Sequence, residues 1–299
     1  MLRELITFSM TPRFCELVGV QLSNAYKSRA PRHKKLGMKP ETASLLCDPM
    51  THEPLRLVSQ EGPEGVAGGL LMGIESGKRF SIRDGIPMFI DYAEVTGLNK
   101  QYQGVYDRTA TIYDLGSRAR RFLMGGWPRK AILVDLKVVD TNKVLEVSIG
   151  TGFNVSLLPR KAEYFGLDIS WGMLKRCQMY MKKLRMDVEL FFGNAEYLPF
   201  KDRTFDVVFH IGGINFFNDK ARAIREMIRV AKPGTRILIG DETARLEGFY
   251  SRLPLVGEGF KGKAELMRPP VEMVPKEMQD VQVKYFYGSF YVLTFTKPA

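Results

Sequence analysis

The sequence predicts a doubly wound α/β domain in the C-terminal two-thirds of the chain, preceded by a small β-rich module. Two observations support this prediction. From residue 142 onward, short β-branched or aromatic runs alternate with longer amphipathic helical patterns, which is typical of βαβ units and a parallel sheet. Between residues 44 and 92, short apolar runs are instead separated by Gly and Pro, which indicates strands joined by tight turns.

The elements are expected in the following order. The module, residues 41–92, has strands at Leu55–Val58, Leu70–Ile74, Arg79–Ile82 and Met88–Ile90. The larger domain, residues 93–299, begins with a helical segment at 98–130. Its seven strands are expected at Lys143–Ile149, Glu163–Ile169, Asp187–Gly193, Phe205–Ile211, Thr235–Asp241, Val281–Tyr287 and Phe290–Thr296. Two helical stripes between them predict core-facing helices: Leu174, Cys177, Met181 and Leu184, and then Ile224, Met227, Ile228 and Ala231.

The composition is that of an ordinary globular protein, with 45% hydrophobic and 26% charged residues in 299. No apolar run approaches the ~20 residues of a membrane-spanning helix. The three cysteines, Cys15, Cys47 and Cys177, are odd in number and far apart. They predict no disulfide framework and favour a reducing, cytoplasmic location.

The net charge of +11 is concentrated at the N-terminus. Residues 1–40 hold eight Lys and Arg against two Glu, a net charge of +6. The total therefore does not indicate a basic catalytic surface for nucleic acid. Three interpretations of this basic extension stay open: a partly disordered extension, an organellar transit peptide, or an arm that binds anionic lipid or RNA phosphates.

The strongest site signal is a strand that runs into a glycine turn at Val144–Asn154. Gly150 and Gly152 permit positive φ and close approach of a ligand, and a helix is expected to open near Asn154. Asp168 follows at the end of the next strand, where an acid is the expected partner of ribose hydroxyls. The alternative is that Asp168 caps the following helix, in competition with Ser170.

The turn favours S-adenosylmethionine (SAM) over a dinucleotide. The third glycine of a dinucleotide fingerprint is missing, because Phe153 and Asn154 follow Gly152. Glu146, in the strand before the turn, would repel a pyrophosphate but suits the ammonium group of SAM. Asn194 and Ala195 follow the third strand, where they are expected to contact the adenine.

Residues from about 100 to 299 resemble a class I SAM-dependent methyltransferase of the group that includes the quinone-biosynthesis (UbiE-like, methyltransferase type 11) enzymes. The residues that carry the resemblance are Glu146–Asn154, Asp168, Gly193–Pro199, Phe205–Gly213, the Lys-Pro-Gly run that ends Arg225–Gly234, and Tyr106–Asp114. The resemblance implies a Rossmann-like seven-stranded methyltransferase sheet, SAM as cofactor, and a helical lid at 98–130. Two positions depart from it: Ser148 stands for the first glycine of the turn, and Thr235 for the second glycine of the Pro-Gly-Gly turn.

The predicted cofactor-binding residues are Tyr106, Tyr113, Glu146, Ser148, Gly150, Gly152, Asp168, Ile169, Met173, Asn194, Ala195, Glu196, His210 and Gly212. His210 is also the predicted catalytic base, because it ends the fourth strand beside the expected methyl group. The alternative is that His210 is a core or pocket-wall residue. Asn215, Phe216 and Phe217 follow it and are expected to line the substrate pocket.

The module resembles the zinc-ribbon-like domain related to tRNA-methyltransferase activators, through Leu45–Leu55 and Arg79–Phe89. Zinc-binding members carry paired cysteines, but here only Cys47 remains and Met50 stands at the second position. Cys47 and His52 cannot make a four-ligand site, so no metal is predicted. The module is then a packing or substrate-recognition element.

The leading functional hypothesis is methyl transfer from SAM to a small-molecule acceptor, with a hydrophobic quinone- or lipid-like compound favoured. Peripheral contact with an anionic membrane would suit such an acceptor and the basic N-terminus. Two alternatives are an RNA methyltransferase and a SAM-binding partner protein without turnover. Aromatic residues interleaved with Lys and Arg, which RNA recognition favours, are absent near the motifs. The acceptor, the methylated atom and the oligomeric state stay open.

Overall fold

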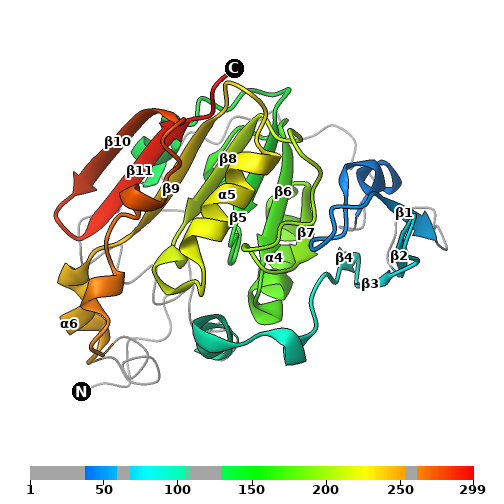
Figure 1. The fold of residues 1–299 in the computed structure, drawn as a ribbon, viewed down its shortest axis with the longest axis horizontal. Helices are drawn as coiled ribbons and strands as arrows, with labels where there is room; N and C mark the ends of the chain where they lie inside the picture. The colour runs from blue at the N-terminus through cyan, green and yellow to red at the C-terminus, as the bar shows by residue number, and fades with distance from the viewer. Residues whose placement is uncertain (1–37, 59–67, 106, 108–128, 253–260) are drawn as a thin grey trace, which may run out of the picture. The chain divides into compact units, whose positions relative to one another are not determined.

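Seven strands form the main sheet, in the order β10-β11-β9-β8-β5-β6-β7 (Figure 1). The strands are β5 Lys143–Val147, β6 Glu163–Asp168, β7 Val188–Phe192, β8 Val207–Ile211, β9 Arg236–Glu242, β10 Gln279–Phe286 and β11 Phe290–Thr296. Neighbours from β9 to β7 are parallel, whereas β11 and β10 are added antiparallel at the far edge. Each strand ends within two residues of its predicted bounds. The predicted doubly wound α/β sheet is therefore confirmed.

The computed structural model describes residues 38–58, 68–105, 107, 129–252 and 261–299. Nearly all of the predicted basic extension, 1–40, lies outside the described residues, as do residues 106 and 108–128 of the predicted lid. In the described part of that lid, residues 97–105 are helical and α3 spans Arg129–Val134. Within the described residues, no helix is both long and apolar enough to cross a membrane.

The chain enters the main sheet at its centre. β5 pairs in parallel with β6 on one side and with β8 on the other. The chain runs from β5 through β6 to β7, then returns to β8 on the other side of β5 and continues to β9, so the strand order reverses at β5. In open α/β sheets, ligands bind outside the carboxyl ends of the strands at such a reversal. The predicted glycine turn after β5 lies at this point.

The helices bury the predicted apolar stripes against the sheet. α4 spans Trp171–Leu184 and α5 spans Lys220–Val230. Ser170 caps α4 by accepting the Met173 N–H at 3.1 Å, and Asp219 caps α5 in the same way. The shorter helices are α6 Glu247–Tyr250 and the 3-10 turns η1 Pro40–Leu45, η2 Tyr92–Glu94, η3 Val155–Leu157, η4 Ile214–Phe216, η5 Ala244–Leu246, η6 Ala264–Leu266 and η7 Val271–Met273.

The helix expected to open near Asn154 does not form as an α-helix. Only the 3-10 turn η3 follows the glycine turn, and Leu158 is already extended, with φ −91° and ψ 168°. Leu158 precedes Pro159, and a proline disfavours the helical conformation of the residue before it. The prediction overlooked this proline.

A second sheet of four antiparallel strands corresponds to the predicted module: β1 Leu55–Val58, β2 Gly69–Gly73, β3 Arg79–Arg83 and β4 Ile86–Pro87. The first three match the prediction closely. The fourth, expected at Met88–Ile90, is Ile86–Pro87 instead, and the Met88 N–H still donates to the Ser81 carbonyl of β3 at 2.9 Å. Met88 forms an isolated parallel bridge with Phe192 of β7, and the Phe89 N–H donates to the Phe192 carbonyl at 2.8 Å.

The small sheet and the main sheet share one hydrophobic core. Leu71 and Phe80 of the small sheet belong to the same buried cluster as Phe165, Phe191 and Phe200 of the larger domain. Backbone bonds add to this contact: the Cys47 N–H donates to the Pro199 carbonyl at 3.1 Å. Both sheets lie within one compact unit, Lys35–Ala299. The small sheet thus covers the β7 edge, which would otherwise present unpaired backbone groups.

Candidate functional site

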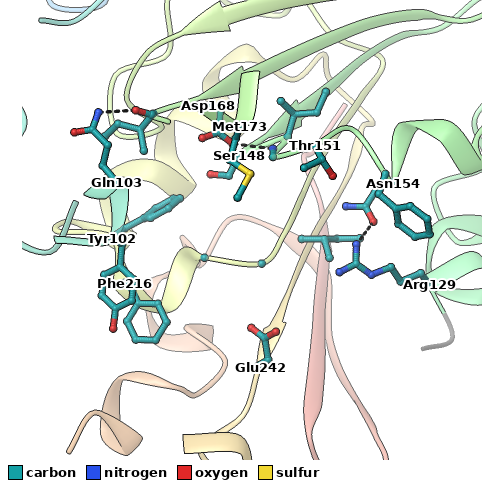
Figure 2. Close-up of a pocket in the computed structure, with 18 of the residues that line it drawn as sticks. Tyr102, Gln103, Arg129, Ser148, Thr151, Asn154, Asp168, Met173, Phe216 and Glu242 are labelled. Carbon is teal, nitrogen blue, oxygen red and sulfur yellow. Dashed lines mark hydrogen bonds between the residues drawn. The ribbon is translucent and has the colours of Figure 1, made fainter. Parts of the chain in front are cut away.

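A pocket of about 290 Å³ opens at the carboxyl ends of β5, β6, β8 and β9 (Figure 2). Its lining comes from helical residues 97–105, the start of α3, the turns after β5, β6 and β8, and the adjoining ends of β9 and β11. The polar lining residues include Ser148, Gly150, Thr151, Asn154, Asp168, Arg129 and Glu242, and the aromatic ones are Tyr102, Phe153, Phe216, Phe217 and Phe290. The pocket therefore offers both charged groups and ring surfaces to a ligand.

The glycine turn has the backbone that its sequence predicts. Ser148, Gly150 and Gly152 have φ of 58°, 57° and 78°, the left-handed region that favours glycine. Ser148, the departure from the family pattern, thus keeps the glycine-like conformation. A side chain at Gly150 would project into open space, whereas one at Gly152 would lie 2.7 Å from Cys177 Sγ. Gly150 lines the pocket, and Gly152 allows the turn to pack against α4.

Asp168 joins the turn to the second strand. Its Oδ2 accepts the Gly150 N–H at 2.7 Å and its Oδ1 accepts the Ser170 N–H at 2.9 Å. Burial raises the pKa of Asp168 to about 6, although these two hydrogen bonds oppose the rise. Because Ser170 caps α4, Asp168 is not the helix cap that the alternative interpretation required. Its carboxylate lies at the pocket wall beside the turn (Figure 2).

Glu146 lies behind the pocket and is fully buried. Its Oε1 accepts from Asn154 Nδ2 at 2.6 Å, and Asn154 Oδ1 accepts from Arg129 Nη1 at 2.7 Å. Its Oε2 has no hydrogen-bond partner among the described residues. Burial raises the pKa of Glu146 to about 8. Asn154 and Arg129 line the pocket and Glu146 does not, so Glu146 reaches the pocket through Asn154.

His210 is buried and bonded on both sides of its ring. Its Nδ1 lies 2.9 Å from the Val147 carbonyl, and its Nε2 accepts the Ile214 N–H at 3.0 Å. Nδ1 therefore carries the proton of a neutral ring, and burial lowers the pKa of His210 to about 4. His210 is absent from the pocket lining. This geometry favours the core role that the sequence left open, and it gives the ring no free lone pair with which to accept a substrate proton.

The remaining predicted residues divide between the pocket and its support. Ile169, Met173 and Gly212 line the pocket, as do Phe216 and Phe217. Asn194, Ala195 and Glu196 lie outside the lining, and Tyr106 and Tyr113 lie outside the described residues. Glu196 accepts from Asn99 Nδ2 at 2.8 Å and from the Asp219 N–H at 3.1 Å, so it ties the helix at 97–105 to α5.

Tyr102, Gln103, Glu242 and Phe290 are among the lining residues that were absent from the predicted set. Tyr102 stacks on Phe216 with ring centroids 4.0 Å apart, and Gln103 donates to the Ile169 carbonyl at 2.6 Å. The aromatic spacing of the predicted lid was a signal for Tyr102. Glu242 ends the fifth strand, where a pocket residue is expected, but Phe290 enters only through the antiparallel pairing of β11 with β9.

No metal site accompanies this pocket in the part of the chain that the structure describes, since no group of three His, Cys, Asp or Glu side chains comes together there. Cys47 is buried, and burial raises the pKa of its thiol to about 11. A thiol must lose its proton to bind zinc. The turn after Cys47 is closed by Asp48, whose Oδ1 accepts the Met50 and Thr51 N–H groups at 2.6 and 3.1 Å.

The pocket fits a nucleoside that carries an ammonium group. Asp168 supplies a carboxylate beside an open glycine turn, and Glu146 supplies a second, incompletely bonded carboxylate behind it. A pyrophosphate would need the N-terminus of an α-helix, and the turn leads only into the 3-10 turn η3. The doubly wound sheet and this site define the class of SAM-dependent methyltransferases of the class I type.

Comparison with known proteins agrees with that class. Residues 145–239 match the family described as "Methyltransferase domain". The chain is 35% identical to the demethylmenaquinone methyltransferase of Thermotoga maritima over 176 residues, covering 54% of this chain and 75% of that protein. It is 34% identical over 192 residues to the ubiquinone/menaquinone biosynthesis C-methyltransferase UbiE of Pasteurella multocida, covering 58% and 71%.

A solved structure shows the same fold. Phosphoethanolamine N-methyltransferase 2 of Haemonchus contortus, determined in complex with SAM, superimposes with a TM-score of 0.52 at 16% identity, covering 73% of this chain and 63% of that one. The chain belongs to the class I SAM-dependent methyltransferase family. It is an enzyme of that family, and SAM is its cofactor.

Proposed function

We propose that this methyltransferase acts on a hydrophobic small molecule of quinone- or lipid-like character. The main support is the pocket itself, in which the polar turn after β5 and a wall of aromatic side chains share one cavity. The relatives add to this support, since two of them are named for quinone substrates. A third, the phthiotriol/phenolphthiotriol dimycocerosates methyltransferase of Mycobacterium tuberculosis, is 32% identical over 140 residues that cover 42% of it.

The cofactor would be held by side chains and backbone from three strand ends. Asp168 would accept the ribose hydroxyls, and Ile169 and Met173, which line the same pocket, would contact the adenine. Glu146, acting through Asn154, balances the ammonium group of the methionine end. When bound, SAM supplies a methyl group on a positively charged sulfur.

The chain's own contribution to methyl transfer is alignment and exclusion of water. The stacked rings of Tyr102 and Phe216 close one side of the pocket, and Gln103 fixes the helix at 97–105 to the end of β6. A substrate that fills this cavity beside the cofactor would displace water from the reacting atoms. His210 acts through the backbone that it holds, because both ring nitrogens are already bonded.

The module at 41–92 would serve as a packing element. Its residues share the main core and cover the β7 edge, and none of those described lines the pocket. The alternative hypothesis of an RNA methyltransferase lacks a comparable observation. Among the described residues, Arg129 and Lys130 are the two cationic residues of the pocket lining. A groove that follows a phosphate backbone needs more positive charge than these two residues provide.

Calorimetric titration with S-adenosylhomocysteine tests the cofactor site. We expect binding to the wild type and an affinity about 10- to 100-fold lower for Asp168→Asn, because charged hydrogen bonds to the ribose are lost. Asp187→Asn, an exposed acid just before β7, is the matched control and should bind like the wild type. Folded wild-type protein that binds no S-adenosylhomocysteine would contradict the proposed site.

Transfer of a labelled methyl group from SAM then tests the acceptor class. We expect label to enter reduced quinones or a lipid extract, and not RNA. Label found in RNA alone would overturn the proposed acceptor class while leaving the methyltransferase assignment intact.

A further inference from the structure

One wall of the pocket carries an acid that cofactor binding does not use. Glu242 is the last residue of β9, and Phe290, the first of β11, pairs directly with it across the two strands. Directly opposed residues project from the same face of a sheet, and both line the pocket. Figure 2 shows Glu242 on the side of the pocket away from Asp168 and Met173, with its carboxyl group directed into the cavity.

The neighbouring acid, Asp241, has a different environment. It is fully buried, and its carboxylate accepts the N–H groups of Gly213, Asn215 and Glu242 at 3.1, 2.9 and 2.9 Å. Asp241 therefore holds the turn after β8. The Asp241 carboxyl group also hydrogen-bonds to that of Glu242. Glu242 is half-buried and lines the pocket whereas Asp241 does not, so Glu242 makes the pair's contact with the pocket.

The backbone around Glu242 is rigid. Its carbonyl accepts from Asn215 Nδ2 at 2.7 Å, and Asn215 Oδ1 accepts from the Tyr291 hydroxyl at 3.1 Å. These bonds join β9, β11 and the turn η4 that carries Phe216. The carboxylate of Glu242 and the rings of Phe216 and Phe290 are thus presented together by paired strands and a braced turn, which is the precision that a reacting group needs.

A half-buried carboxylate among aromatic rings has a defined ligand preference. The rings of Phe216, Phe217 and Phe290 offer faces and edges for a planar aromatic molecule. The carboxylate accepts a hydrogen bond, so it selects a ring that carries a hydroxyl group.

We propose that Glu242 is a catalytic residue that binds a hydroxyl group of a planar phenol- or quinol-type acceptor and takes its proton during methyl transfer. This inference rests on the proposed function and names its acceptor class. As the proton passes to the Glu242 carboxylate, the ring carbon next to the hydroxyl forms a bond with the methyl carbon. The methyl–sulfur bond breaks, and its electron pair stays on sulfur as a neutral thioether. The ring carbon then loses its own proton to water, and Glu242 returns the first proton to the oxygen.

Methyl transfer to a reduced quinone provides the first test, with Glu242→Gln, Glu242→Asp and the control Glu272→Gln, an exposed acid on η7. We expect kcat to fall at least about 100-fold in Glu242→Gln, the scale of general base catalysis. Glu242→Asp should recover part of the rate, and Glu272→Gln all of it. Affinity for S-adenosylhomocysteine should stay within about twofold of the wild type in every variant, since Glu242 is assigned no cofactor contact.

Binding of para-nitrophenol with S-adenosylhomocysteine present gives a readout that does not depend on turnover. The Glu242 carboxylate should hold the phenol in its neutral form, so the absorbance of the phenolate should fall on binding to the wild type and not to Glu242→Gln. In the wild type alone, para-nitroanisole, which lacks the hydroxyl proton, should bind about 10-fold or more weakly than para-nitrophenol.

The outcomes separate the two proposals. Wild-type protein that methylates no reduced quinone or lipid contradicts the proposed function. Wild-type transfer with an unchanged rate in Glu242→Gln overturns the role of Glu242 alone. Equal binding of para-nitrophenol and para-nitroanisole, or no binding of either, overturns the hydroxyl contact even if the variants fail to fold.

Discussion

Carboxylates behave in opposite ways in the small sheet and in the pocket. In the small sheet, Asp48 lies 3.0 Å from Lys78 Nζ and accepts two backbone N–H groups. Glu53 accepts the Glu75 and Ser76 N–H groups at 2.9 and 3.0 Å. Burial alone would raise the pKa of Asp48, but these hydrogen bonds outweigh it and lower the pKa. The Ser76 hydroxyl is the main cause that lowers the pKa of Glu53.

In the pocket, burial dominates instead. The pKa of Glu146 rises to about 8 and that of Asp168 to about 6, because their protein donors do not make up for the lost water. The acids of the small sheet thus have donors strong enough to offset their lost water, whereas the acids near the pocket do not. A lowered pKa therefore distinguishes the acids that stabilise the turns of the small sheet from the acids with raised pKa values near the pocket, which are candidates for ligand binding.

The largest effect that tests this comparison is the pH dependence of stability caused by Glu146. Its folded pKa of about 8 lies above its ordinary value of 4.5. The folded protein therefore holds the Glu146 proton more tightly than the unfolded chain does. The contribution of this proton to the free energy of unfolding is complete below pH 4.5 and is lost as the pH rises through 8. In Glu146→Gln without cofactor, we expect the loss of unfolding free energy between pH 6 and 8 to be smaller by about 2–3 kcal/mol.

Urea unfolding of the cofactor-free proteins at each pH measures this difference. Asp168 has a pKa of about 6, so its own contribution falls mostly below that window. Glu163→Gln, an exposed acid at the start of β6, is the control and should follow the wild type. Parallel wild-type and Glu146→Gln curves would show that Glu146 is ionised like the acids of the small sheet, and the contrast would fail.

A smaller effect is expected from Asp48→Ala in the small sheet. The change removes the acceptor of two backbone N–H groups and the partner of Lys78, which should lower the unfolding free energy by about 1–3 kcal/mol. Because the two sheets share a core, we expect one unfolding transition at a lower Tm, seen by circular dichroism. Affinity for S-adenosylhomocysteine should not change, and a loss of affinity would mean that the small sheet takes part in binding.

The smallest effect is expected from a chelator. Cys47 is buried with a raised thiol pKa, and Asp48 closes the turn that follows it. We therefore expect EDTA to leave the Tm of the protein unchanged, and added zinc to leave it unchanged as well. A fall in Tm on chelation, reversed by zinc, would show that the small sheet is held by a metal and not by its carboxylates.

The sequence predicts the parallel strands well because each is a separate run of apolar residues with its own turn signal. The glycine turn, Asp168 and the capping role of Ser170 are local in the same sense, and all lie near their expected places. The end of the small sheet was harder to predict, since Met88 pairs with Phe192, 104 residues away in the sequence.

The aromatic wall of the pocket could not be predicted in the same way. Glu242 and Phe290 come together only through the register of β9 with β11, and a one-residue slip of β11 would turn the Phe290 side chain to the other face of the sheet. The two bonds of the His210 ring also depend on tertiary structure, since one comes from β5 and the other from the turn after β8. Local sequence patterns do not predict such long-range contacts.

The shared core has a consequence for the order in which the chain is made. The Lys39 N–H donates to Glu189 Oε2 at 2.9 Å across 150 residues of sequence. At ribosomal rates of about 5–20 residues per second, the small sheet would leave the ribosome on the order of 10 s before β7 is available to it. The apolar face of the small sheet stays exposed to water until β7 has been synthesised, so newly made chains should depend on chaperones more than the finished protein does.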